Sequence, residues 1–179
     1  MKKIKIIKNK GILFWITGLS GSGKTTIAHK IKSKIQKKYG PTIVVSGDDL
    51  RNIFNFKNYD SKERIILSKK FNKFAKFITN QNINLIFAVV GMIHSMRAWN
   101  KKNIKNYIEI YIKSDLKNKI KFKRKKIYFK KNNNESIVGI NIKPQFPKKP
   151  HIMINNRFDK PINRLSDNII KKIDKLIEL

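Results

Sequence analysis

The sequence predicts an α/β fold with a five-stranded parallel sheet and helices on both of its faces. Short apolar runs alternate with stretches of helical periodicity, which is typical of parallel strands joined by crossover helices. A glycine-rich loop follows the first apolar run, at the edge of the sheet where ligands bind in such folds. The expected strands are Ile12–Thr17, Ile43–Ser46, Leu85–Val90, Tyr107–Ile112 and His151–Ile154.

Helical patterns fill the segments between these runs. The predicted helices cover residues 24–39, where Gly40 and Pro41 end the pattern, then residues 61–81 and 115–122. A last helix is expected to begin at Ser166, because its hydroxyl suits an N-cap and an apolar face follows it. Phe71, Phe74 and Phe77 repeat at helical spacing, which predicts that all three lie in the core.

The segment from Gly18 to Thr25 matches the phosphate-loop pattern G-x-x-x-x-G-K-[ST] in full. Backbone N–H groups of such a loop surround phosphate oxygens at the start of the following helix. Lys24 is expected to reach the β- and γ-phosphates of ATP, and the Thr25 hydroxyl to bind Mg²⁺. The residues expected to bind ATP are Gly18, Leu19, Ser20, Gly21, Ser22, Gly23, Lys24, Thr25 and Thr26.

A second candidate site follows the second expected strand, in Ser46-Gly47-Asp48-Asp49-Leu50-Arg51. Parallel strands end at the same edge of a sheet, so a carboxylate here would face the phosphate loop. Asp48 could then hold Mg²⁺ or accept the proton of an attacking hydroxyl, and Arg51 could bind an anionic acceptor. The alternative is that the acidic pair only caps a helix.

The composition is strongly basic. Among 179 residues, 42 Lys and Arg against 11 Asp and Glu give a formal net charge of +31. The length fits one domain over residues 1–179. Such a charge attracts polyanions, so a nucleic-acid surface is one interpretation. Compositional drift is the other, and we favour it because lysines are spread along the whole chain while arginine, the usual partner of phosphate and guanine, is scarce.

Several functional classes are excluded or disfavoured. The absence of cysteine excludes a disulfide framework, a thiolate metal site and a cysteine nucleophile. No stretch has the length of a membrane span, so we expect a cytoplasmic protein without a membrane partner. His29, His94 and His151 lack metal-ligand spacing and are expected to be packing or surface residues.

Residues 121–150 interrupt the alternation of strands and helices. They contain dense lysine, three consecutive asparagines and the spaced prolines Pro144, Pro147 and Pro150. A long irregular segment between two strands is where a phosphotransferase carries a mobile lid. We expect a basic lid over residues 121–150, whose lysines would neutralise charge on a transferred phosphoryl group. A plain solvated loop is the alternative.

The chain resembles adenylyl-sulfate (APS) kinases over roughly residues 11–156. The segment from Phe14 to Ala28 is similar to their opening, and residues 46–51 resemble their Asp-Gly-Asp-x-[Val/Ile]-Arg motif. Asn55 falls on a family asparagine, and residues 58–64 resemble the segment Gly-Phe-Ser-x-x-Asp-Arg. Gly139-Ile140-Asn141 and the prolines after it resemble the family's Gly-Ile-Asp segment.

This resemblance implies a P-loop kinase that transfers the γ-phosphoryl group of ATP to the 3′-hydroxyl of adenylyl sulfate in sulfate assimilation. It implies Asp48 and Lys24 as catalytic residues, with Thr25 and Asp48 at the Mg²⁺ ion. The implied partner is a small nucleotide-linked acceptor, and a homodimer is left open. The expected acceptor-binding residues are Arg51, Asn55, Tyr59, Arg64 and Arg97.

Three positions depart from the family pattern. Ser46 replaces the first acid of the motif, Leu67 stands at an acceptor-binding asparagine, and Ile137 stands at an aromatic that stacks on the adenine of the acceptor. Residues 99–107 and 145–150 resemble a branch found in bacterial surface-polysaccharide gene clusters, some members of which phosphorylate CDP-phosphoramidate. The alternatives are therefore, in order, adenylyl sulfate, another nucleotide-linked acceptor such as CDP-phosphoramidate, and a nucleic acid.

Overall fold

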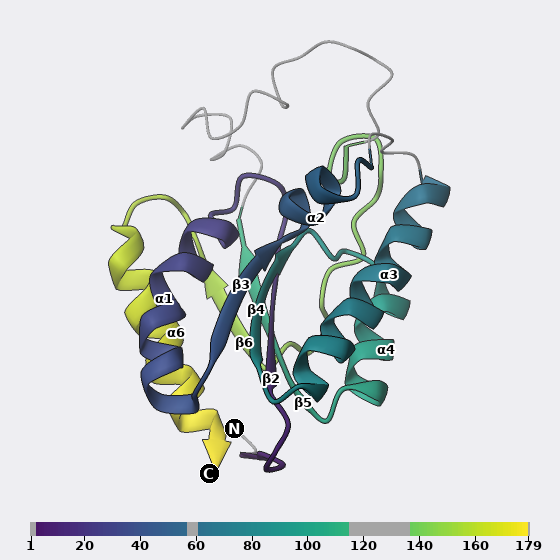
Figure 1. Ribbon diagram of the computed structural model, residues 1–179. Helices are drawn as coiled ribbons and strands as arrows, with labels where there is room; N and C mark the ends of the chain where they lie inside the picture. Colours follow the sequence, from purple (N-terminus) through teal and green to yellow (C-terminus); the bar gives the residue numbers. More distant parts are fainter. Residues whose placement is uncertain (1–2, 57–60, 115–136, 179) are drawn as a thin grey trace.

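The computed structural model describes residues 3–56, 61–114 and 137–178, and these form three layers (Figure 1). The central sheet contains five parallel strands in the order β3-β4-β2-β5-β6. They are β2 (Ile12–Thr17), β3 (Thr42–Ser46), β4 (Asn84–Val89), β5 (Asn106–Lys113) and β6 (Ile152–Asn155). The predicted α/β fold with a five-stranded parallel sheet is confirmed. Strand β2, which leads into the phosphate loop, lies at the centre of this sheet.

The central strands are buried along their whole length because helices cover both faces of the sheet. Every residue of β2 and β4 is buried. Side chains alternate between the two faces, so Phe14 packs in one core cluster and its neighbour Trp15 in the other. In register, Trp15 lies between Phe87 of β4 and Glu109 of β5.

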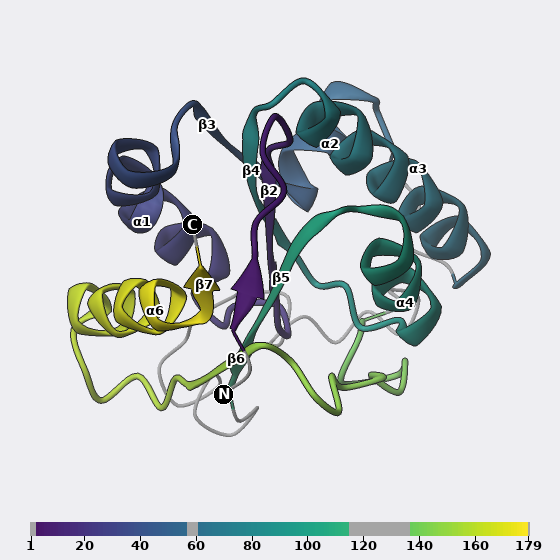
Figure 2. The same ribbon diagram turned by 90° about the horizontal axis from the view of Figure 1, so that it is seen from below.

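Two helices lie on each face (Figure 2). On one face α1 (Lys24–Tyr39) and α6 (Ile162–Leu176) pack side by side. On the other face α3 (Ser61–Asn80) packs against α4 (His94–Asn103). Helix α1 ends as predicted at Gly40, whose N–H donates to the carbonyl of Gln36 at 3.0 Å.

Two helices of the structure lie outside the predicted helical segments. A short helix, α2 (Gly47–Ile53), follows β3, and α4 follows β4. Helix α4 shows no clear apolar stripe because two of its three buried residues, Arg97 and Asn100, are polar. Its amphipathic pattern is therefore hidden from a sequence search for apolar periodicity.

Other expectations are wrong in detail. Helix α6 begins at Ile162 after Pro161, whose fixed φ of −57° suits a helix start, so Ser166 is not the N-cap. The Ser166 hydroxyl instead donates to the carbonyl of Ile162 at 2.9 Å. Phe77 is 62% exposed and lies outside the core. The expected helix over 115–122 lies outside the described residues.

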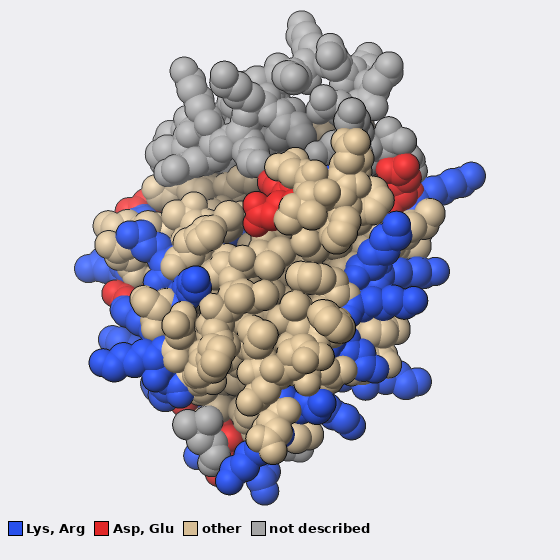
Figure 3. Space-filling view, viewed as in Figure 1, with Lys and Arg blue, Asp and Glu red and all other residues tan. Residues whose placement is uncertain are grey.

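The chain ends meet at the edge of the molecule away from the phosphate loop. There β1 (Ile4–Lys5) pairs in parallel with β7 (Ile177–Glu178). Within the described ranges, no helix combines the length and the apolar character needed to cross a membrane. Figure 3 shows Lys and Arg side chains on both flanks of one face, with an uncharged strip between them.

Candidate active site

The phosphate loop connects the end of β2 to α1. Gly21 and Gly23 have φ values of +71° and +89°, in the left-handed region that favours glycine. Gly23 is also the N-cap of α1, and the Ser22 N–H donates to the carbonyl of Leu19 at 3.2 Å. The loop therefore turns tightly enough to bring consecutive backbone N–H groups to the start of α1, which suits an anion.

Lys24 lies at the first position of α1 and is only 8% exposed. Its Nζ donates to the Leu19 carbonyl at 2.8 Å and to Ser22 Oγ at 3.4 Å. These contacts hold the ammonium group against the loop itself. The most strongly charged group of the motif is thus already placed beside the phosphate-binding backbone.

The start of α2 separates the roles of the two neighbouring acids. Ser46 is the N-cap, and its Oγ accepts from the Asp49 N–H at 3.1 Å. The Asp49 carboxylate accepts from the Ser46 N–H at 2.7 Å, which completes a capping box. Asp49 is therefore the capping acid, whereas Asp48 is exposed and lines the main cavity. Ser46, at the position of the family's first acid, has a structural role as the cap.

A cavity of about 730 Å³ lies at the carboxyl edge of the sheet. Most of the predicted site residues meet there. Those that line it are Ser20, Gly21, Gly23, Lys24, Thr25, Thr26, Asp48, Arg51 and Arg64. Gly18, Leu19 and Ser22 do not line it but form the buried base of the loop. Tyr59 lies outside the described residues, as does the part of the predicted lid before Ile137.

Two predicted acceptor-binding residues do not reach this cavity. Asn55 is exposed beyond the end of α2 and does not line it. Arg97 is 5% exposed on the buried side of α4, where its guanidinium donates to the backbone carbonyls of Gly91 and Gln145. Its donors are used within the protein and it does not line the cavity, so this geometry does not support the expected contact with the acceptor, which stays a prediction.

Much of the cavity lining is apolar. Leu67 of α3 and Ile137 line it, and they are 4% and 8% exposed. Residues 137–145 form the part of the predicted lid that the structure describes, and Val138 and Ile142 there form a single β-bridge. Lys143 and Gln145 from this segment also line the cavity. Val138 packs against Leu19 of the phosphate loop, so residues 137–142 line the cavity beside that loop. The apolar lining from α3 and residues 137–142 is called the wall below.

Asn156 is a site residue that the sequence reasoning missed. It is 4% exposed just after β6, and its Nδ2 donates to the carbonyl of Ser22 at 3.0 Å. Its Oδ1 accepts from the N–H of Phe158 at 3.0 Å. One side chain thus ties the phosphate loop to the loop after β6, which also lines the cavity through Phe158 and Lys160. Its position at the carboxyl end of a strand was the available signal.

The donor set fits a magnesium ion held largely by a nucleotide. Thr25 and Asp48 place a hydroxyl and a carboxylate in the same cavity. Mg²⁺ in phosphotransferases is held by one or two protein oxygens, waters and phosphates. The described residues contain no group of three or more His, Cys, Asp and Glu side chains that could hold a metal alone.

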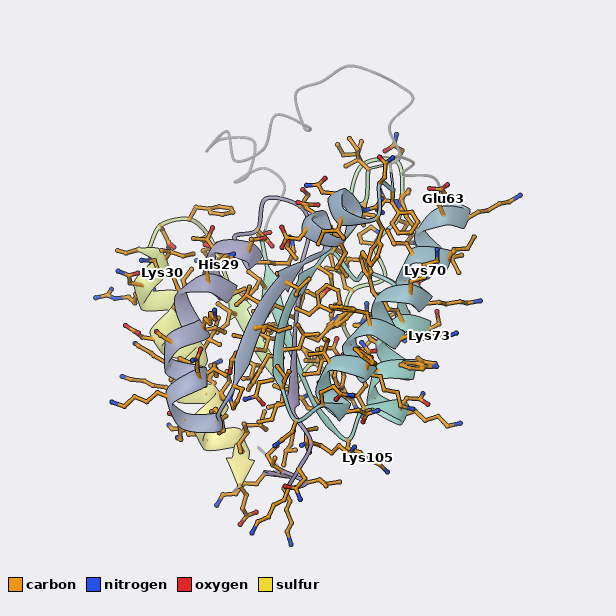
Figure 4. The ribbon with its side chains drawn as sticks, viewed as in Figure 1. His29, Lys30, Glu63, Lys70, Lys73 and Lys105 are labelled. Atoms are coloured by element: carbon orange, nitrogen blue, oxygen red, sulfur yellow. The ribbon has the colours of Figure 1, made fainter. Side chains whose placement is uncertain are left out.

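A buried charge pair lies behind the cavity. Arg97 Nε is 3.1 Å from Glu109 Oε1, and the two side chains are 5% and 13% exposed. Burial raises the pKa of Glu109 above its ordinary value, and the charge of Arg97 opposes that rise. The three histidines fit the expected roles: His29 is exposed on α1 (Figure 4), His94 is exposed on α4, and His151 Nδ1 accepts from the Glu109 N–H at 2.8 Å.

Comparison with known proteins shows the family. The family model for adenylylsulphate kinase matches residues 10–155. A cytidine diphosphoramidate kinase of Campylobacter jejuni is 37% identical over 169 residues, which cover 93% of this chain and 99% of that protein. An adenylyl-sulfate kinase of Clostridium acetobutylicum is 32% identical, with coverage of 93% and 85%.

Solved structures agree on the fold. The APS kinase of Mycobacterium tuberculosis in complex with AMPPNP and APS superposes with a TM-score of 0.80. It is 22% identical, and the match covers 92% of this chain and 98% of that one. The predicted resemblance and the assignment to a kinase family are confirmed. The chain belongs to the adenylylsulphate kinase family of P-loop phosphotransferases.

Proposed function

We propose that the protein is a Mg²⁺-dependent kinase that transfers the γ-phosphoryl group of ATP to a hydroxyl of cytidine diphosphoramidate. The observation that carries the choice of acceptor is the apolar wall of the cavity. Leu67 and Ile137 line it where the APS kinase pattern has an asparagine and an aromatic that stacks on adenine. The Campylobacter relative, 37% identical and matched over 99% of its length, has this activity in its name.

Leu67 and Ile137, in place of the asparagine and the aromatic of the APS kinase pattern, weaken the case for an adenine base on physical grounds. An aromatic platform contributes about 1–3 kcal/mol to base binding through stacking, and an isoleucine cannot stack in that way. A leucine in place of an asparagine also removes a hydrogen-bonding group that would read the acceptor. The wall therefore offers a base apolar contact but no aromatic platform at Leu67 and Ile137.

The proposed chemistry is mainly positioning and charge neutralisation. The N–H groups of the phosphate loop and Lys24 bind the transferred phosphate oxygens. Asp48 orients the acceptor hydroxyl and takes its proton. Arg51 and Arg64, which line the same cavity, bind the anionic groups of the acceptor. Mg²⁺, held by Thr25 and Asp48 with the nucleotide, would supply further neutralisation of phosphate charge.

Adenylyl sulfate is the second candidate. It is favoured by the family match and by the 32% identical Clostridium relative, which is an adenylyl-sulfate kinase. Arg51 and Arg64 suit either acceptor because both carry a negatively charged group attached to a nucleotide. A cytoplasmic location and a homodimer stay predictions.

Release of ADP from Mg-ATP, with three acceptors in parallel, tests the proposal. We expect kcat/KM for cytidine diphosphoramidate to exceed that for adenylyl sulfate by about tenfold or more, since loss of one stacking contact has that effect. A 5′-hydroxyl oligonucleotide is the third acceptor and should give no turnover. Turnover with adenylyl sulfate alone, or with the oligonucleotide alone, would contradict the proposal.

A matched variant tests the wall directly. Leu67→Asn with Ile137→Phe restores the family residues, so the preference should shift towards adenylyl sulfate by about tenfold. The KM for ATP should stay the same because neither residue belongs to the phosphate loop. An unchanged acceptor preference in a folded double variant would remove the wall from the explanation.

A further inference from the structure

We propose that Arg97 is a positioning residue that holds the acceptor side of the cavity in place. It binds the loop after β4, the segment 137–145 and β5 at one point, without lining the cavity itself. The set of Arg97, Gly91, Gln145 and Glu109 is called the Arg97 clamp below. The part of this inference that concerns acceptor binding rests on the proposed function, whereas the part that concerns the wall does not.

The guanidinium group of Arg97 contacts three separate segments of the chain. Nη1 donates to the Gly91 carbonyl at 2.6 Å, in the loop after β4. Nη2 donates to the Gln145 carbonyl at 2.7 Å and to His94 Nδ1 at 2.7 Å, which must accept because arginine has no acceptor. Nε lies 3.1 Å from Glu109 Oε1 on β5. The planar fork of donors on arginine makes this joint contact feasible.

Gln145 reinforces the same junction. Its backbone N–H donates to the Met92 carbonyl at 3.1 Å, and its Oε1 accepts from the His94 N–H at 2.6 Å. Gly91, Met92 and Gln145 all line the cavity. The clamp therefore fixes two lining segments against each other although they are about fifty residues apart in sequence.

The charge pair alone does not explain this arrangement. Arg97 and Glu109 are both nearly buried, and a buried ion pair can often be replaced by apolar groups without loss of stability. An apolar side chain could fill the space but could not bind the carbonyls of Gly91 and Gln145. We therefore expect replacement of the whole pair to keep the fold and to loosen the wall.

Four variants separate positioning from stability. Arg97→Met leaves Glu109 buried and unpaired, so the melting temperature should fall. Arg97→Met with Glu109→Gln removes both charges and should recover most of the melting temperature. Arg97→Lys keeps the charge but offers a single ammonium group, so it should retain only part of the function. Lys102→Met, at an exposed position of α4, is the matched control and should behave as the unaltered protein.

Amide hydrogen exchange measures how often the hydrogen bonds of residues 137–145 open, and it needs no acceptor. In the double variant, the amide of Gln145 and its neighbours in 137–145 should exchange about tenfold faster or more, because their anchoring hydrogen bonds open more often. Amides of α1 should be unchanged. Unchanged exchange at 137–145 would overturn the clamp as a positioning device, whatever the acceptor.

Steady-state kinetics with cytidine diphosphoramidate then tests the link to the site. In the double variant, KM for this acceptor should rise about tenfold while KM for ATP stays within about twofold. Recovery of both melting temperature and acceptor KM, or an equal rise in both KM values, would show a purely structural role. Absence of turnover in the unaltered protein would count against the proposed function, and the exchange result would still decide the clamp.

Discussion

The two halves of the cavity are built in different ways. The phosphate side is made from nine consecutive residues, Gly18 to Thr26, at the junction of β2 and α1. The acceptor side is assembled from α2, α3, the loop after β4 and residues 137–145. A local motif supplies the residues of the first half, whereas distant segments supply those of the second.

Because the two halves are built differently, we expect the phosphate side to be similar among relatives and the lining of the acceptor side to vary. The phosphate loop must bind the same triphosphate in every member of the family, and its backbone geometry needs glycine and lysine at set positions. The acceptor side can change its lining, as at Leu67 and Ile137, while the scaffold around it stays the same. Substitutions in the two halves should therefore have distinct kinetic signatures.

The largest effect is expected on the phosphate side. Lys24→Ala removes the ammonium group that the loop holds 2.8 Å from the Leu19 carbonyl. We expect kcat to fall by about 10³-fold or more, since the transferred phosphoryl group loses the cation that the loop supplies. ADP release measures this, with Lys30→Ala as the control, because Lys30 is exposed on the same helix (Figure 4). A Lys24→Ala protein with normal turnover would refute the assigned role of the loop.

The next largest effect is expected at Asp48, between the phosphate side and the acceptor side of the cavity. Asp48→Asn should lower kcat by about 10²-fold or more while ATP binding is largely retained, because a general base is lost and the phosphate loop is intact. Asp49→Asn is the matched control. It weakens the capping box and should lower the free energy of unfolding by about 1 kcal/mol without a comparable effect on kcat. Equal kcat values for the two variants would exclude Asp48 as the base.

A smaller effect is expected at Asn156, behind the phosphate loop. Asn156→Ala removes the bonds to the Ser22 carbonyl and the Phe158 N–H, so the Kd for ATP should rise about tenfold. Asn156→Asp keeps the acceptor for Phe158 but brings a negative charge to the loop, so it should bind ATP more weakly than the alanine variant. Calorimetric titration with Mg-ATP measures both. Tighter binding by the aspartate variant would show that Asn156 does not support the phosphate loop.

The same difference explains how far the sequence could predict the molecule. The phosphate loop depends on a local pattern, so Gly18 to Thr26 could be placed from the sequence alone. The start of α6 at Ile162 could not be predicted. Ser166 is a favourable N-cap residue, and the sequence favours it over Pro161, which precedes the helix in the structure. The buried position of Arg97 could not be predicted either. The resemblance to APS kinases suggested an acceptor contact, and only the distant partners Gln145 and Glu109 show that Arg97 is held within the protein.

The smallest effect concerns acid stability at the contact between His151, just before β6, and strand β5, away from the cavity lining. His151 Nδ1 accepts from the Glu109 N–H, which requires the neutral ring, and Tyr107 packs against that ring edge to face at 5.9 Å. Burial, and then the charge of Lys101, lower the pKa of His151 from its ordinary value of 6.5.

Because the unfolded chain binds the proton more readily, the free energy of unfolding should fall as the pH drops below about 6.5, until the folded protein is also protonated. His151→Asn keeps an acceptor for the Glu109 N–H but cannot titrate. Denaturant unfolding at a series of pH values between 7 and 5 should therefore show a shallower slope for this variant, by no more than one proton. His94, whose pKa is also lowered, remains in both proteins and contributes equally to each slope. Identical slopes would show that the contact between His151 and β5 carries no pH dependence.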